Sequence, residues 1–107
     1  MVREINPQEA LQRQRSGARV VDVREPNEWA RGHVSGAEHI PLDVLPTRLR
    51  DGAIPREGEI LFICASGGRS ANAAAMAAAN GYRNVASVAG GTSEWAYLGL
   101  PVEGAGR

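Results

Sequence analysis

The chain has 107 residues and a formal net charge of zero, with 12 acidic and 12 basic side chains interspersed along it. Its length suits one compact domain over residues 1–107, and its balanced charge excludes a basic surface for nucleic acid or an anionic membrane. All the basic residues are arginine, so neither a Schiff-base lysine nor a phosphate-loop lysine supplies the chemistry.

The first half of the chain predicts one longer helix, one buried strand and several short elements. Asn6-Pro7-Gln8-Glu9 has the pattern of a helix start, with an asparagine N-cap followed by proline, so we expect a helix through about Arg15. Residues 20–23 are a β-branched run typical of a buried strand. The other expected elements are a short helix over 26–31, a loop containing His33 between Gly32 and Gly36, a strand over 38–40, and a helix over 42–50 with Pro46 in its first turn.

The second half predicts strands that alternate with helices. Residues 60–63, Ile-Leu-Phe-Ile, read as a strand, and an alanine-rich helix is expected over 70–80, closed by Gly81 in a left-handed cap. Residues 85–88 are expected to be the last strand, before a short helix over 94–97. This alternation predicts an α/β fold whose central, mostly parallel sheet carries helices on both faces.

The sequence gives no sign of a membrane segment or a metal centre. The N-terminus lacks an apolar run of signal-peptide length, and no stretch approaches the length of a membrane span, so we expect a soluble, cytoplasmic protein. The single cysteine excludes an internal disulfide and a CxxC redox pair. With only His33 and His39 beside it, a structural zinc site would need an unusual ligand set, and we expect no metal.

The most informative residue is Cys64, which follows the strand over 60–63 and precedes the alanine-rich helix. Unpaired amides at a helix N-terminus stabilise an anion, and such positions lower a thiol pKa from about 8.5 to between about 3.5 and 7.5. In an open α/β sheet, ligands bind outside the carboxyl ends of the strands, where this cysteine would emerge. The turn after it is polar and glycine-rich, so Cys64 is predicted to be a nucleophile rather than an inert core residue.

The length of the loop after Cys64 separates two kinds of cysteine chemistry. Four residues lie between Cys64 and Arg69, whereas a tyrosine-phosphatase loop resembles C-x5-R, with a cup wide enough for phosphate. A tighter cup suits a terminal sulfur atom carried on Cys64 as a persulfide. Sulfur transfer is therefore the favoured reaction, with a phosphatase-like or arsenate-reductase-like enzyme as the alternative.

Three segments, in this order, resemble the single-domain rhodaneses, which are thiosulfate sulfurtransferases, and they span nearly the whole chain. The first comprises Val21-Asp22-Val23-Arg24-Glu25-Pro26-Asn27-Glu28-Trp29 and Gly32-His33-Val34-Ser35-Gly36-Ala37-Glu38-His39-Ile40-Pro41. The second is the six-residue active-site loop with the serine after it, Cys64-Ala65-Ser66-Gly67-Gly68-Arg69-Ser70, and the third is Val88-Ala89-Gly90-Gly91 with Trp95 and Gly99-Leu100-Pro101.

The resemblance implies a rhodanese-like domain and a double-displacement cycle that needs no cofactor. The Cys64 thiolate takes the outer sulfur of thiosulfate, or of a persulfide donor, and passes it to cyanide or a thiol. A sulfur-accepting protein is a further expected partner, and a carrier loaded and unloaded by partner proteins stays open as an alternative. The loop that binds the sulfur donor is predicted to comprise Ala65, Ser66, Gly67, Gly68, Arg69 and Ser70.

We expect individual residues of the loop to have different roles. Arg69 is expected to attract thiosulfate and to lower the thiol pKa, and Gly67 and Gly68 to let the backbone curve. Ser66 and Ser70 are candidate hydroxyl donors, although a serine at position 70 is equally suited to capping the helix.

The remaining polar and aromatic residues are expected to be structural, including the charged cluster after the first strand that comprises Asp22, Arg24, Glu25 and Glu28. Asp22 is predicted to bond loop amides, and Arg24 to pair with a carboxylate near the rim of the site. His33 is not expected to act as a general base, because a preformed thiolate needs none. Trp29 and Trp95 are expected to be core anchors.

Overall fold

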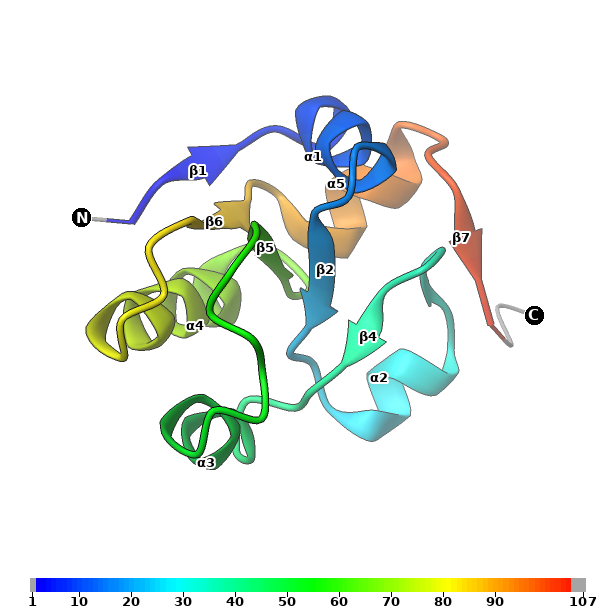
Figure 1. Ribbon diagram of the computed structural model, residues 1–107. Helices are drawn as coiled ribbons and strands as arrows, with labels where there is room; N and C mark the ends of the chain where they lie inside the picture. The colour runs from blue at the N-terminus through cyan, green and yellow to red at the C-terminus, as the bar shows by residue number, and fades with distance from the viewer. Residues whose placement is uncertain (1, 105–107) are drawn as a thin grey trace.

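The computed structural model describes residues 2–104 and contains a five-stranded parallel sheet (Figure 1). The strand order is β1-β6-β5-β2-β4, where the strands are β1 (Glu4–Ile5), β2 (Arg19–Asp22), β4 (Glu38–His39), β5 (Ile60–Ile63) and β6 (Val85–Val88). A separate antiparallel pair joins β3 (His33–Val34) to β7 (Val102–Glu103). The helices are α1 (Pro7–Arg15), α2 (Pro26–Ala30), α3 (Leu45–Arg50), α4 (Gly68–Ala79) and α5 (Gly91–Tyr97).

Helices cover both faces of the sheet, as predicted, and each face has its own core. Because side chains alternate along a strand, Val21 and Phe62 face α3 and α4, whereas Val20 and Leu61 face α1 and α5. The helical residues on the first face are Leu45, Leu49, Ala73, Ala74 and Ala77, and those on the second are Ala10 and Trp95. The buried alanines of α4 have small side chains, so this helix lies close to β5 and β6.

Local signals in the sequence explain where the long helices begin and end. The Asn6 side chain accepts a hydrogen bond from the Glu9 amide at 2.8 Å, which confirms the predicted N-cap of α1. At the C-terminal end of α4, the chain leaves the helix through Asn80 and Gly81. Gly81 has φ +89°, the left-handed conformation expected there. Helix α3 begins at Leu45 rather than near residue 42, with Pro46 in its first turn.

The structure adds three strands that the sequence analysis did not predict. Strand β1 is held at the edge of the sheet because the Ser87 and Ala89 amides donate to the carbonyls of Arg3 and Ile5 at 2.9 and 2.8 Å. Strands β3 and β7 correct two expectations, since His33 lies in a strand rather than a loop and β6 is not the last strand. Each added strand has two residues, too few to show alternation, so only pairing with a distant segment reveals it.

The two tryptophans have different surroundings. Trp95 is fully buried in the core beside α1, as predicted. Trp29 is only half-buried and lies outside the two cores: its ring stacks on His33 with centroids 3.5 Å apart, and on His39 at 4.7 Å. The expectation that Trp29 is a core anchor is therefore wrong, because a short helix at the sheet edge has no apolar layer to enter.

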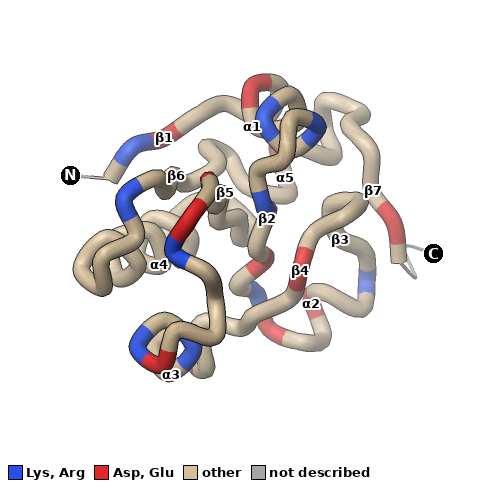
Figure 2. The backbone as a smooth tube through the Cα atoms, in the orientation of Figure 1, with Lys and Arg blue, Asp and Glu red and all other residues tan. Residues whose placement is uncertain are grey.

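Charged residues are spread over the described part of the chain. In Figure 2 blue and red segments are interspersed along the tube, and many of them pair, as Arg19 does with Glu38 at 2.6 Å. Among residues 2–104, no helix is both long and apolar enough to cross a bilayer. The ends of the predicted domain, at residues 1 and 107, lie outside the described residues.

Candidate active site

Cys64 lies directly after β5, at the carboxyl end of the central strands, as the sequence predicted. The next residues form a short loop that enters α4 at Gly68, with Gly67 as the N-cap. The cysteine is 1% exposed and belongs to the core cluster beneath α4. Its sulfur therefore sits at the bottom of the loop rather than on its surface.

The Cys64 sulfur is surrounded by hydrogen-bond donors. The amides of Gly67 and Ser70 donate to Sγ at 3.1 and 3.3 Å, and the Ser70 hydroxyl oxygen lies 3.4 Å away. Burial raises the pKa of the Cys64 thiol, but the Ser70 hydroxyl and the amides of Ser70, Gly67 and Ser66 outweigh it, so the pKa lies below its ordinary value. The loop is thus built to hold a thiolate.

The backbone of the loop requires glycine at two positions. Gly67 has φ +120°, a conformation that side chains disfavour, and it turns the chain back towards the sulfur. At Gly91, a Cβ atom would lie 2.3 Å from the Cys64 carbonyl oxygen, so only glycine lets α5 approach the loop. The amides of Thr92 and Ser93 then donate to the carbonyls of Cys64 and Ala65 at 2.7 and 3.1 Å. Gly68 has no positive φ, which corrects the expectation that both loop glycines supply unusual curvature.

Ser70 occupies the third position of α4 and is fully buried. Besides its contacts with Cys64, its hydroxyl donates to the Gly67 carbonyl at 3.1 Å and lies 2.7 Å from the hydroxyl of Ser87 on β6. Ser70 is therefore not the N-cap of α4, and its side chain belongs to the wall around the sulfur.

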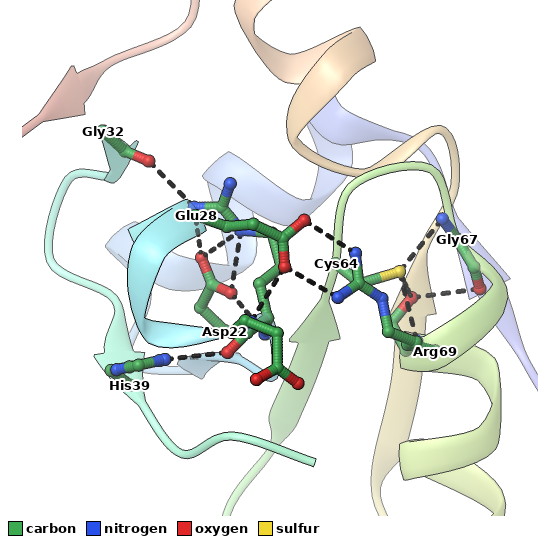
Figure 3. Close-up of polar contacts among 10 residues, drawn as sticks. Asp22, Glu28, Gly32, His39, Cys64, Gly67 and Arg69 are labelled. Atoms are coloured by element: carbon green, nitrogen blue, oxygen red, sulfur yellow. Dashed lines mark hydrogen bonds and ion pairs between the residues drawn. The ribbon is translucent and has the colours of Figure 1, made fainter. Parts of the chain in front are cut away.

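Arg69 is bound by a carboxylate from another element. Its Nη1 and Nη2 atoms donate to the two carboxylate oxygens of Glu28 on α2 at 2.7 and 3.0 Å (Figure 3). The hydrogen bonds from Arg69 lower the pKa of the Glu28 carboxyl to about 2. Glu28 also accepts from the Glu25 amide at 2.8 Å, which fixes the carboxylate against the start of α2. The positive charge beside the loop is thus neutralised in the free protein.

The strongest causes that lower the thiol pKa are a hydroxyl and amides, and the Coulombic attraction between Cys64 and Arg69 is not among them. The dashed lines in Figure 3 accordingly join the Cys64 sulfur to Gly67, and the Arg69 guanidinium to Glu28. Arg69 therefore acts on the thiol through a Coulombic attraction weaker than those hydrogen bonds, and binding of thiosulfate by Arg69 stays a prediction. Ser66 is exposed, and among its atoms the backbone amide is the one that acts on the sulfur.

Asp22 and Arg24 form a buried pair with each other, so both have the structural contacts that were expected of them separately. Asp22 accepts from the Arg24 amide at 2.9 Å and from its guanidinium, and Arg24 also donates to the Gly32 carbonyl at 2.8 Å. His39 contacts the Arg24 carbonyl at 2.9 Å. This cluster fixes the turn between β2 and α2, and thereby the position of Glu28.

His33 has a structural position, as expected. Its Nδ1 atom lies 3.0 Å from the Trp29 carbonyl, its ring stacks on the indole, and its Nε2 atom lies 3.6 Å from the Glu103 carboxylate. None of these contacts, among the residues the structure describes, involves Cys64. Within the same residues no group of three or more histidine, cysteine or acidic side chains is arranged for a metal ion.

A cavity of about 610 Å³ opens beside the loop. Ala65 lines it from the loop side, Thr92 and Ser93 from α5, and Arg31 and Glu103 from the opposite wall. Arg24 also belongs to its lining, whereas no residue of the segment over 42–50 does. Cys64 is not among the residues that line this cavity.

Three residues of the site were not identified as functional from the sequence. Glu28 was grouped with other charged residues as structural, Ser87 was hidden within an apolar strand, and Gly91 appeared only as part of a segment. A polar residue at a core position of a strand is the one local signal that would have singled out Ser87. The pairing of Glu28 with Arg69 joins residues 41 positions apart, which no spacing rule detects.

Comparisons with known proteins agree with this geometry. A family model described as "Rhodanese-like domain" matches residues 6–97. A sulfurtransferase of Allochromatium vinosum is 35% identical over 104 residues, which cover 95% of each chain. The thiosulfate sulfurtransferase GlpE of Pseudomonas entomophila is 34% identical over 93 residues, which cover 87% of this chain and 84% of the relative.

The same likeness is present among solved structures. The crystal structure of a rhodanese-related protein from Thermoplasma volcanium superposes with a TM-score of 0.81 at 32% identity. The match covers 94% of this chain and 97% of the other one. The family model, over residues 6–97, includes the whole Cys64 loop.

Proposed function

The chain belongs to the rhodanese-like domain family, and from this membership we propose that it is a sulfurtransferase that carries sulfur on Cys64. The proposed donor is thiosulfate or a persulfide, and the proposed acceptor is a thiol or cyanide. The observation that carries the proposal is the placement of Cys64. This residue directly follows a central strand, and its sulfur accepts hydrogen bonds from the Gly67 and Ser70 amides. Such donors stabilise a thiolate before any substrate arrives.

The first half-reaction loads the cysteine. The Cys64 thiolate attacks the outer sulfur of thiosulfate, a new S–S bond forms, and the old S–S bond breaks with its electron pair leaving on sulfite. The product is a Cys64 persulfide anion. In the second half-reaction the acceptor attacks the outer sulfur, the Cys64–sulfur bond breaks, and the electron pair returns to Cys64 as thiolate.

The loop geometry supports a persulfide in particular. An S–S bond is about 2.05 Å long, so loading moves the reactive sulfur about 2 Å away from the buried Sγ position. The first amides of a helix have no acceptor within the helix, and those of Gly68 and Arg69 in the first turn of α4 suit the terminal sulfur. Because Cys64 is 1% exposed, the persulfide is more accessible to an acceptor than the thiolate is to a donor.

The cavity beside Ala65 suits the body of an organic acceptor. Its walls carry side chains of both charges, among them Arg31, His33 and Glu103. A small thiol with charged or polar substituents would find partners there, while its sulfur approaches the loop. Cyanide needs no such space, so the cavity bears on the thiol acceptor alone.

A protein-loaded sulfur carrier is the second candidate, and one observation favours it. Arg69 is already paired with Glu28 through two hydrogen bonds, so the loop offers a dianion less positive charge than its sequence suggested. A carrier that receives sulfur from a partner protein does not need to attract free thiosulfate. Transfer from thiosulfate without any added protein separates the two candidates.

The proposal is tested by measuring the intact mass of the protein after incubation with thiosulfate. We expect the native chain to gain one sulfur atom with release of sulfite, and cyanide to remove that atom as thiocyanate. Cys64→Ser is the control, because serine keeps the size of the side chain without forming a persulfide. If Cys64→Ser also gained sulfur, the sulfur would be bound at another residue. If the native chain gained none, the proposed transfer from thiosulfate would be wrong, and the protein-loaded carrier or a phosphatase-like enzyme would be the remaining candidates.

A further inference from the structure

Ser87 lies directly beneath the active-site loop although it belongs to the middle of β6. Its neighbours Ala86 and Val88 face the core beside α1 and α5, so alternation along the strand turns Ser87 towards α4. Ser87 is fully buried, and its hydroxyl oxygen lies 2.7 Å from that of Ser70. A polar side chain thus stands at a core position and contacts a residue of the sulfur-binding wall.

The hydrogen-bond partners of the two hydroxyls determine which of them donates in this contact. Among the described residues, the one hydrogen-bond partner of the Ser87 hydroxyl is Ser70. A buried hydroxyl hydrogen without an acceptor is costly, so Ser87 donates and Ser70 accepts. The Ser70 hydroxyl therefore keeps its own single hydrogen for another acceptor.

Two acceptors are within reach of that hydrogen, and which one receives it depends on Cys64. When Cys64 is a thiol, its S–H group points to Ser70, and Ser70 donates to the Gly67 carbonyl at 3.1 Å. When Cys64 is a thiolate, the Ser70 hydrogen turns to the sulfur, 3.4 Å away. The Gly67 carbonyl still accepts from the Ala71 amide at 3.1 Å, so this change leaves no carbonyl unpaired.

We propose that Ser87 is a positioning residue of the active site, whose hydroxyl holds Ser70 as an acceptor and so directs the Ser70 hydrogen to the Cys64 thiolate. The inference deepens the proposed function, because the thiolate is the form that the sulfur-transfer cycle requires. No covalent bond changes in this step, and the proton released by the thiol goes to solvent. Ser87 itself touches neither the sulfur donor nor the reacting sulfur.

The charged groups near the sulfur do not orient the Ser70 hydroxyl, so they cannot substitute for Ser87. Arg69 has a Coulombic interaction with Cys64, but the Arg69 guanidinium is already bound by the Glu28 carboxylate. The relay of Ser87, Ser70 and Cys64 contains one ionisable group, the thiol. A change in its pKa on removal of the Ser87 hydroxyl therefore reports the orientation of Ser70.

The test measures the rate of Cys64 alkylation by iodoacetamide as a function of pH, which reports the thiol pKa without any sulfur donor. We expect Ser70→Ala, which removes the donor itself, to reduce the thiolate population about tenfold at neutral pH, a shift of about one pKa unit. In Ser87→Ala the Ser70 hydroxyl hydrogen can occupy any of its roughly three staggered positions, so we expect the thiolate population to fall about threefold. Ser87→Thr, which keeps the hydroxyl, is expected to restore the native profile.

A double-variant cycle separates orientation from a general loss of packing. If Ser87 acts through Ser70, then Ser87→Ala shifts the alkylation profile in the native background and not in the Ser70→Ala background. Val88→Ala is the matched control, because it truncates the next core residue on the opposite face and should lower the thermal midpoint without moving the profile. An unchanged profile for Ser87→Ala, or an equal shift in both backgrounds, would overturn the proposal.

This readout distinguishes the relay from the proposed function. Alkylation involves neither thiosulfate nor an acceptor, so a chain that fails to transfer sulfur still reveals whether Ser87 controls the thiolate. Conversely, normal sulfur loading with an alkylation profile that ignores Ser87 would retain the sulfurtransferase and discard the relay.

Discussion

Replacing Glu28 by glutamine tests whether the carboxylate on α2 limits the use of thiosulfate. The change removes the negative charge that holds Arg69, while the remaining amide oxygen can still accept from the Glu25 amide. We expect the freed guanidinium to bind the sulfonate end of thiosulfate. The KM for thiosulfate should therefore fall, with a smaller change in kcat.

The size of the effect follows from the contacts that are exchanged. A hydrogen bond to a charged group contributes about 1.5–3 kcal/mol, and the Arg69 side chain is 36% exposed, so solvent screening leaves the lower end of this range. A difference of about 1.4 kcal/mol corresponds to a tenfold change in affinity. We therefore expect KM to fall about tenfold in an assay of thiocyanate formation from thiosulfate and cyanide.

Two further variants serve as controls for this interpretation. Glu25→Gln removes the same charge one turn away without touching the Arg69 guanidinium, and should change KM less than twofold. Arg69→Ala should raise KM and abolish the effect of Glu28→Gln in the double variant. An unchanged or higher KM in Glu28→Gln would refute the view that the carboxylate competes with the donor for Arg69.

The same pair predicts a pH dependence of stability. Because the folded pKa of Glu28 is about 2 and its ordinary value is 4.5, the pair stabilises the fold fully above about pH 4.5 and progressively less as the pH falls towards 2. Without solvent screening, a pKa shift of this size would correspond to about 3 kcal/mol of stability, but the partial exposure of the pair reduces this to about 1 kcal/mol. Urea unfolding of the native chain and Glu28→Gln should differ by this amount at pH 7 and converge near pH 2; a constant difference would contradict the assignment.

Two glycine substitutions in and beside the loop should have opposite effects on the free energy of unfolding. Gly91→Ala places a Cβ atom 2.3 Å from the Cys64 carbonyl at a residue with φ +58°, and should cost about 3 kcal/mol and most of the sulfur transfer. A native thermal midpoint for this variant would show that α5 can move away freely. Gly68→Ala meets no atom within 4 Å and lies in the first turn of α4, so urea unfolding should show a gain of up to about 1 kcal/mol. A loss of stability would mean that the loop needs glycine there.

Much of the fold could be predicted from local patterns. The Asn6 cap, the apolar run over 60–63 and the alanines followed by Gly81 each act over a few residues, and the elements they predicted are present. The missed strands are those whose existence depends on a partner far along the chain. Strand β3, for example, pairs Val34 with Val102, and neither segment carries an alternating pattern of its own.

The sequence by itself determined the nucleophile, because a lone cysteine between an apolar strand and a small-residue helix has a defined place at the carboxyl edge of a parallel sheet. It also determined the number of residues in the loop, and therefore how tightly the loop closes. Only the tertiary structure decided which side chains tune that nucleophile. Glu28 reaches Arg69 from α2, Ser87 reaches Ser70 from β6, and α5 approaches the loop at Gly91. Each of these contacts joins distant segments across a packed interface, and such contacts depend on the geometry of the whole sheet rather than on local sequence.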